Sequence, residues 1–104
     1  MSTVERMVDY LKTADLSPGN QPAAAKALGM APRTLVSHLS EHGTTYSALV
    51  MKERRRRFEA LLGRNPHADT YAAMKVTGYK AGNSVTIAAK RWFGTTFRQH
   101  RASQ

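Results

Sequence analysis

Residues 23–39, AAAKALGMAPRTLVSHL, combine a small residue, a glycine and two leucines at spacings typical of few folds. Ala25 is small enough for a point where two helices cross, and Gly29, four residues later, suits a tight turn between them. Leu35 and Leu39 are four residues apart and supply apolar anchors on one face of a second helix. The pattern predicts a helix-turn-helix unit, and the alternative is an ordinary helical hairpin.

Glycine and proline residues divide the rest of the chain into helical segments. Ser2 and Glu5 have the spacing of a capping box at the start of a first helix. Further helices are predicted over residues 22–29, 32–43, 44–63, 68–78, 81–94 and 95–101. These are seven helices without a convincing strand, so the predicted fold class is all-α.

A second, weaker copy of the pattern follows the longest segment. Gly78 stands four residues after Met74, and the next helix carries on one side Val85, Ala88, Ala89 and Trp92. Met74 is larger than the alanine normally wanted at a tight crossing, so this unit is expected to open its crossing angle or to shift register. The predicted organisation is a single domain over 1–104, with a first unit at about 4–43, a connecting helix at about 44–63 and a second unit at about 67–101.

Four consecutive arginines, Arg54 to Arg57, lie in the connecting segment. On a helical wheel with about 100° per residue, Arg54 and Arg57 fall inside the apolar arc, whereas Arg55 and Arg56 point away from it. We therefore expect the first pair to pack along the apolar seam with hydrogen-bonded heads, and the second pair to face solvent or phosphate. The alternative is a uniformly solvated basic stripe.

The charge of the chain is strongly positive and unevenly placed. Sixteen Lys and Arg stand against seven Asp and Glu, which gives a net charge of +9, and no acid follows Asp69. Because each neutralised phosphate releases counterions, such a domain is typical of nucleic-acid binding; a basic domain without that partner is the alternative. Cysteine is absent, which excludes disulfides and thiol chemistry. No membrane-spanning run or signal peptide is present in the sequence, so we expect no membrane partner and a cytoplasmic location.

Two helix-turn-helix patterns joined by one long helix resemble the DNA-binding domain of the AraC/XylS family of bacterial transcription regulators. The segments that carry the resemblance are LGMAPRTLVSHLSEHGTTYSALVMKERRRRFEALL and GYKAGNSVTIAAKRWFGTTFRQHR, and it covers roughly residues 4–101. The second unit departs from the family at Val85 and Ala89, at Phe97 and His100, and at Ile87, where a base-reading arginine is common. Trp92, Phe93 and Phe97 are expected to refill its core. The Met1 start with its capping box favours a stand-alone short member over an excised fragment.

The resemblance implies a regulator whose two recognition helices enter successive major grooves, about 34 Å apart, on one face of DNA. The base-contacting residues are then expected to be Arg33, Thr34, Val36, Ser37, Gly82, Asn83 and Ile87. Phosphate contacts are expected from Ser40, Arg55, Arg56, Lys80, Ser84, Lys90 and Arg91. Structural roles are expected for Ala25, Gly29, Leu35, Leu39, Arg54, Gly78 and Trp92.

The first unit is expected to dominate base readout, because its outward face offers more groups that hydrogen-bond base edges. Double-stranded DNA is the predicted partner, at the bacterial nucleoid, with RNA polymerase or another regulator as further candidates. The alternative function is a protein-interaction or architectural module that binds another regulator or a nucleoprotein complex. His38 and His42 are four residues apart but lack further ligands, and the hydroxyl residues lack a matching histidine and acid. We therefore expect no metal site, no cofactor and no enzymatic activity.

Overall fold

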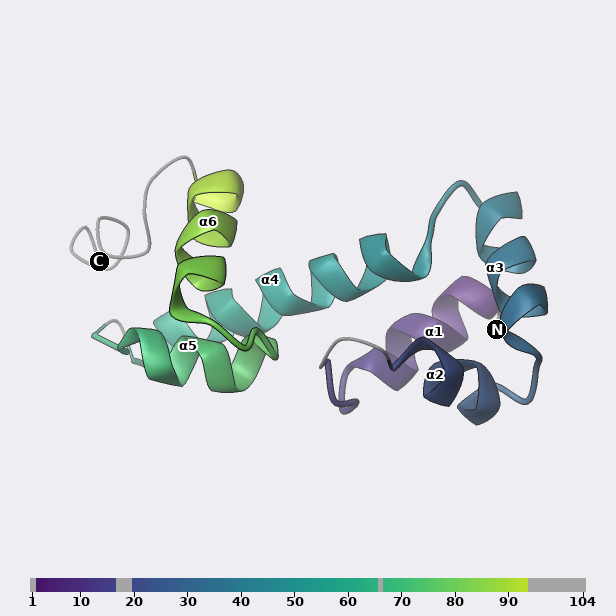
Figure 1. The fold of residues 1–104 in the computed structure, drawn as a ribbon, viewed down its shortest axis with the longest axis horizontal. Helices are drawn as coiled ribbons and strands as arrows, with labels where there is room; N and C mark the ends of the chain where they lie inside the picture. Colours follow the sequence, from purple (N-terminus) through teal and green to yellow (C-terminus); the bar gives the residue numbers. More distant parts are fainter. Residues whose placement is uncertain (1, 17–19, 66, 94–104) are drawn as a thin grey trace. The chain divides into compact units, whose positions relative to one another are not determined.

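The computed structural model of the chain describes residues 2–16, 20–65 and 67–93, and these contain six helices and no strand (Figure 1). The helices are α1 (Thr3–Leu11), α2 (Gln21–Ala27), α3 (Pro32–Glu41), α4 (Tyr46–Arg64), α5 (Thr70–Thr77) and α6 (Gly82–Phe93). The prediction of an all-α fold is confirmed for this part of the chain. Six helices are found instead of seven, because the last predicted helix, over 95–101, lies outside the described residues.

The helix ends follow from local hydrogen bonding. Glu5 N donates to Ser2 Oγ at 3.1 Å and Ser2 N donates to Glu5 Oε1 at 3.5 Å, so the predicted capping box starts α1. Asp69 caps α5 by accepting from Ala72 N at 2.9 Å. At the start of α4, Ala48 N donates to the Thr45 hydroxyl at 3.0 Å. These caps satisfy backbone N–H groups that have no partner within the first helical turn.

Glycines in the left-handed region follow α2, α3 and α5. Gly29, Gly43 and Gly78 have φ angles of 74°, 72° and 83°, which side chains with a Cβ adopt only at a cost. After Gly29, the Met30 N–H donates back to the Ala25 carbonyl at 3.0 Å, the longer bond of a Schellman motif. The predicted helix stops at these three glycines are confirmed. Gly63 does not stop α4, which continues to Arg64.

The chain forms two compact units that divide within α4, Met1–Glu53 and Arg54–Gln104. In the first unit α1, α2 and α3 contact one another, and its buried core consists of Met7, Leu11, Leu16, Ala24, Ala25, Leu28, Leu35, Leu39, Leu49 and Val50. In the second unit α5 packs on α6, and the buried core consists of Phe58, Leu61, Leu62, Ala68, Ala73, Val85 and Ala89. The apolar side chains of α4 therefore belong to two separate cores. None of the described helices is long and apolar enough to cross a membrane.

Candidate nucleic-acid interface

The packing of α2 on α3 fixes the direction in which α3 faces. Ala25, Leu35 and Leu39 are all fully buried, as expected for a small crossing residue and two anchors. Helix α1 makes polar contacts with the end of α2 and with α3. Arg6 Nη2 donates to the Leu28 carbonyl at 2.8 Å, and Thr3 Oγ1 lies 3.2 Å from His38 Nδ1. Because one face of α3 is held by these contacts, the opposite face is presented to solvent.

The opposite face of α3 carries the predicted reading residues of the first unit. All five are exposed: Arg33, Thr34, Val36, Ser37 and Ser40. They offer a guanidinium, three hydroxyls and one branched apolar group, of which Val36 is 52% exposed. Such groups match the donors, acceptors and thymine methyl of base edges in the major groove.

An open pocket of about 250 Å³ lies beside this face. Its lining consists of Gln21, Val36, Ser40, Thr44, Thr45, Tyr46 and Ser47, from the start of α2, the outer side of α3 and the start of α4. Four of these residues are Ser or Thr, whose hydroxyls can donate to phosphate oxygens. Thr45 and Ser47 were not among the residues predicted to contact DNA. They could have been found from the sequence, because Ser and Thr residues cluster at the start of the predicted connecting helix, directly after the predicted reading helix.

The turn of the second unit differs from that of the first by one residue. Val85, the first buried anchor of α6, follows Gly78 by seven positions, whereas Leu35 follows Gly29 by six. The second unit therefore has one residue more than the first between its turn glycine and its first buried anchor. The hydroxyl of Thr77, a buried residue, donates to the Ala73 carbonyl at 2.7 Å at the end of α5.

Gly82 lies where α6 approaches α5 closely. A Cβ at this position would be 3.1 Å from Thr70 Cγ2 and 4.0 Å from Met74 Sδ. The missing side chain therefore makes room for the side chains of Thr70 and Met74 at the crossing. Gly82 was predicted as a base-contacting residue, and it has a packing reason to be glycine whether or not it contacts DNA.

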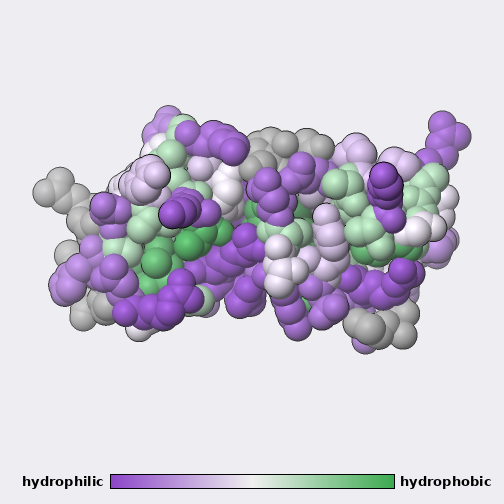
Figure 2. Space-filling view, turned by 90° about the horizontal axis from the view of Figure 1, so that it is seen from below, coloured by the Kyte–Doolittle hydropathy of each residue, from purple (hydrophilic) through white to green (hydrophobic). Residues whose placement is uncertain are grey.

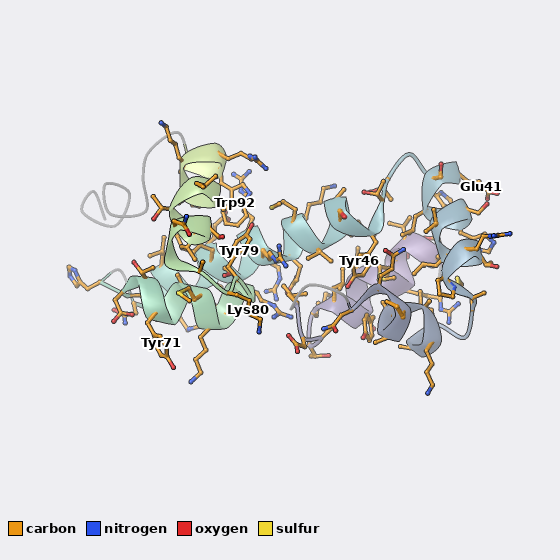
Figure 3. The ribbon with its side chains drawn as sticks, in the orientation of Figure 1. Glu41, Tyr46, Tyr71, Tyr79, Lys80 and Trp92 are labelled. Atoms are coloured by element: carbon orange, nitrogen blue, oxygen red, sulfur yellow. The ribbon has the colours of Figure 1, made fainter. Side chains whose placement is uncertain are left out.

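The outward face of α6 carries polar and basic side chains around one apolar group. Exposed residues on this helix are Asn83, Thr86, Ile87, Lys90 and Arg91, and Ile87 is 59% exposed. Gly82 and Ser84 are half-buried. Lys80, just before the helix, is also exposed (Figure 3). Val85, Ala88 and Ala89 are buried on the other side, so the predicted division of this helix into two faces is present.

Aromatic residues fill the core of the second unit behind this face. The fully buried Phe58 ring has its centroid 5.9 Å from that of Trp92 and 5.6 Å from that of Phe93. Trp92 and Phe93 are partly buried and pack against the core that contains Ala89, which agrees with the role expected of them. Phe97, the third residue expected to do so, lies outside the described residues.

The arginine run is divided as the helical wheel predicts. Arg54 and Arg57 are half-buried, and Arg55 and Arg56 are exposed. The Arg54 guanidinium carbon lies 4.5 Å from the centroid of the Tyr79 ring, which is a cation–π contact. Arg57 Nη1 donates to the Val76 carbonyl at 3.4 Å. Both half-buried arginines thus attach α4 to the second unit.

Arg55 has partners within the protein although it is exposed. Its Nε donates to Glu59 Oε1 at 2.7 Å, and its guanidinium carbon lies 5.7 Å from the centroid of the Phe93 ring. A phosphate would therefore compete with Glu59 for this guanidinium. An exposed ion pair of this kind contributes little stability, so the competition is weak.

We expect Arg54→Ala to lower the free energy of unfolding by about 0.5–2 kcal/mol, because the stacking on Tyr79 is lost. Arg56→Ala is the matched control: it removes the same side chain from an exposed position, and its effect is expected to stay within about 0.5 kcal/mol. Chemical denaturation of both variants measures the difference. Equal losses of stability would contradict a structural role specific to Arg54.

The face of the molecule drawn in Figure 2 is mainly polar. Figure 2 shows hydrophilic side chains over most of the face drawn there, interrupted by smaller hydrophobic areas. Among residues 2–16, 20–65 and 67–93, no three His, Cys, Asp or Glu side chains come together as a group that could hold a metal ion. Each unit has its own candidate surface: the outward face of α3 in the first unit and the outward face of α6, with its basic residues, in the second.

Known proteins provide a comparison for this arrangement. No family model matches the sequence. The chain is 34% identical over 80 residues to the HTH-type transcriptional regulator VirS of Mycobacterium tuberculosis, in strains CDC 1551 / Oshkosh and ATCC 25618 / H37Rv. The match covers 77% of this chain and 23% of the relative, so the chain spans about a quarter of the curated relatives' length.

A solved structure resembles the whole chain. It is the crystal structure of a DNA-binding transcriptional dual regulator from Escherichia coli K-12, with a TM-score of 0.88 and 18% sequence identity. The superposition covers 100% of this chain and 99% of the other. At this identity the likeness concerns the fold alone.

Proposed function

We propose that this chain is a sequence-specific, double-stranded DNA-binding domain of a bacterial transcription regulator of the AraC/XylS type. One observation carries the proposal: in each unit, a glycine turn leads into a helix with buried anchors and outward hydrogen-bonding or basic groups. Similarity to an HTH-type regulator supports it. Transcription regulators are not enzymes, and the chain is not an enzyme. A cytoplasmic location at the nucleoid accords with this function.

The proposed base contacts come from the exposed residues of α3 and α6. Arg33, Thr34, Val36 and Ser37 face the groove from the first unit, and Asn83 and Ile87 from the second, with Gly82 near the bases through its backbone. The first unit dominates base readout in this proposal, because an arginine can form a bidentate contact to guanine.

Phosphate contacts are proposed for the basic and hydroxyl groups at the edges of these faces. The residues are Ser40, Arg55, Arg56, Lys80, Ser84, Lys90 and Arg91. Their cationic members account for much of the net charge of +9, which favours association with a polyanion. Contacts to RNA polymerase or another regulator are compatible with this mode of binding.

Selection of bound duplexes from a random pool, followed by shift assays at several salt concentrations, tests the proposed function. We expect the selected duplex to bind more tightly than random duplex by about tenfold or more at moderate salt. Equal affinity for both would support only non-specific polyanion binding and would contradict sequence-specific regulation.

Replacing Lys90 and Arg91 together with alanine is expected to weaken binding to all duplexes alike. The slope of log affinity against log salt should fall by about one unit per lost phosphate contact. Preference for the selected site over random duplex should persist, because these residues are proposed to contact phosphate. Lost discrimination with an unchanged salt slope would assign base contacts to the C-terminal half of α6.

A protein-interaction or architectural module is the second candidate function, and one observation favours it. Tyr71 is 72% exposed and points away from α5 into solvent (Figure 3), and aromatic residues are enriched in protein–protein interfaces. Under this function a Tyr71→Ala variant would lose a protein partner while its affinity for DNA stayed unchanged. A purified partner that binds the chain only in the absence of DNA would favour it further.

A further inference from the structure

We infer that the second unit reads A·T base pairs, with Ile87 contacting the methyl group of a thymine. The inference rests on the proposed function and specifies the base that this part of the molecule recognises. It starts from an exposed isoleucine: Ile87 is 59% exposed in the middle of α6, although the buried side of the helix already has its own anchors. Among the described residues, Ile87 is neither a member of the core of the second unit nor one of the partly buried side chains packed against that core.

The neighbours of Ile87 indicate the chemistry of its partner. Asn83 is exposed one helical turn earlier, and positions four apart lie on the same helical face. Lys90 and Arg91 are exposed beyond it, and Lys80 precedes the helix. An apolar protein groove would be poorly matched to an isoleucine surrounded by cations. The major groove suits it, because its rims are phosphates and each thymine presents one methyl group at its floor.

The pair Asn83 and Ile87 favours A·T pairs at both of its contacts. An asparagine amide pairs in a bidentate manner with adenine N6 and N7, and an aliphatic side chain contacts the thymine methyl. Four residues of α-helix advance by about 6 Å, which corresponds to about two base-pair steps along DNA. The second unit therefore prefers an adenine and a thymine about two steps apart.

Val36 is the other exposed branched apolar residue on a proposed reading helix, and it lies at the margin of its reading face. It lines the pocket with Gln21, Ser40 and Ser47, at the side of α3 next to the starts of α2 and α4. Hydroxyls at that side suit the sugar–phosphate backbone. Ile87 lies between Asn83 and the basic end of its helix, where a base edge is the expected contact.

Deoxyuridine substitution tests the inference, because it removes the thymine methyl and leaves base pairing intact. In the selected duplex, each thymine is replaced in turn and the affinity of the full chain is measured. We expect one replacement to weaken binding of the unmodified protein by about threefold to fivefold. The same replacement should have no effect on Ile87→Ala, which has already lost the contact. Ile87→Val keeps a branched apolar group and should retain part of the sensitivity.

Val8→Ala is the matched control, since Val8 is also an exposed branched apolar residue but belongs to α1 and not to a proposed reading helix. It should leave the full sensitivity to deoxyuridine in place. If no thymine responds, or if Ile87→Ala responds as strongly as the unmodified protein, the inference is wrong and the proposed DNA binding still stands. If the unmodified protein does not distinguish the selected duplex from random duplex, the proposed function fails and the inference fails with it.

Discussion

Replacing Phe58 with alanine is expected to lower the free energy of unfolding of the second unit by about 3–5 kcal/mol. Phe58 is fully buried and contacts the rings of both Trp92 and Phe93. Its loss removes apolar burial and leaves a cavity between α4 and α6 that rigid aromatic neighbours cannot close. Because this core holds α6, the substitution should also weaken DNA binding under conditions that destabilise the unit.

Amide hydrogen exchange in α5 and α6 measures this effect locally, which matters because a chain with two compact units need not unfold in a single step. Tyr71→Ala provides the matched control: it deletes an aromatic side chain from the same unit at a position that is 72% exposed. Its effect on exchange in these helices should stay within about 0.5 kcal/mol. A Phe58 variant with protection equal to that of the Tyr71 variant would show that the aromatic cluster does not stabilise α6.

Much of the local structure could be predicted because it is determined by local chemistry. Gly29, Gly43 and Gly78 end their helices in the left-handed region, where glycine avoids the cost of a Cβ. The spacing of Leu35 and Leu39 identified the buried face of α3. The helical wheel also predicted correctly that Arg54 and Arg57 are more buried than Arg55 and Arg56. Helical periodicity alone fixes the directions of these side chains around the helix axis.

The core that each buried helix face joins could not be predicted. An amphipathic pattern shows which side of a helix is buried, but it does not show which other elements pack against that side. The apolar arc of α4 looks continuous in the sequence, yet Val50 and Phe58 belong to different cores. Glu53 of α4 is buried although it is charged, and the sequence pattern did not predict this. The ion pair between Arg55 and Glu59 could have been predicted from the sequence, because residues four apart are neighbours on a helix surface.

The site shows the same limit. That Arg33 and Ile87 are exposed follows from the anchors on the opposite faces of their helices. The close approach of Gly82 to Thr70 depends on contact between two helices, and no periodicity within α6 indicates it. Base contacts depend on a DNA sequence, which the protein sequence does not contain.

Replacing Arg33 with alanine is expected to weaken binding to the selected duplex by about 1–3 kcal/mol and to relax preference at one base position. Arg33 is exposed near the start of α3. Leu35 and Leu39 are buried on the opposite face of the helix, so the face that carries Arg33 points to solvent. A guanidinium there can donate two parallel hydrogen bonds to guanine O6 and N7. Affinity for random duplex should fall much less, because that binding depends on phosphate contacts.

Arg33→Lys separates base readout from charge. Lysine keeps the positive charge but lacks the planar pair of donors, so a bidentate contact is lost while attraction to phosphate remains. We therefore expect Arg33→Lys to keep the salt slope of the unmodified protein and to lose preference for guanine at the affected position. Shift assays with the selected duplex and its three variants at that base position, at several salt concentrations, measure both quantities. If Arg33→Lys retains full affinity and full preference, Arg33 acts as a phosphate contact, and the first unit must read its bases through Thr34 and Ser37.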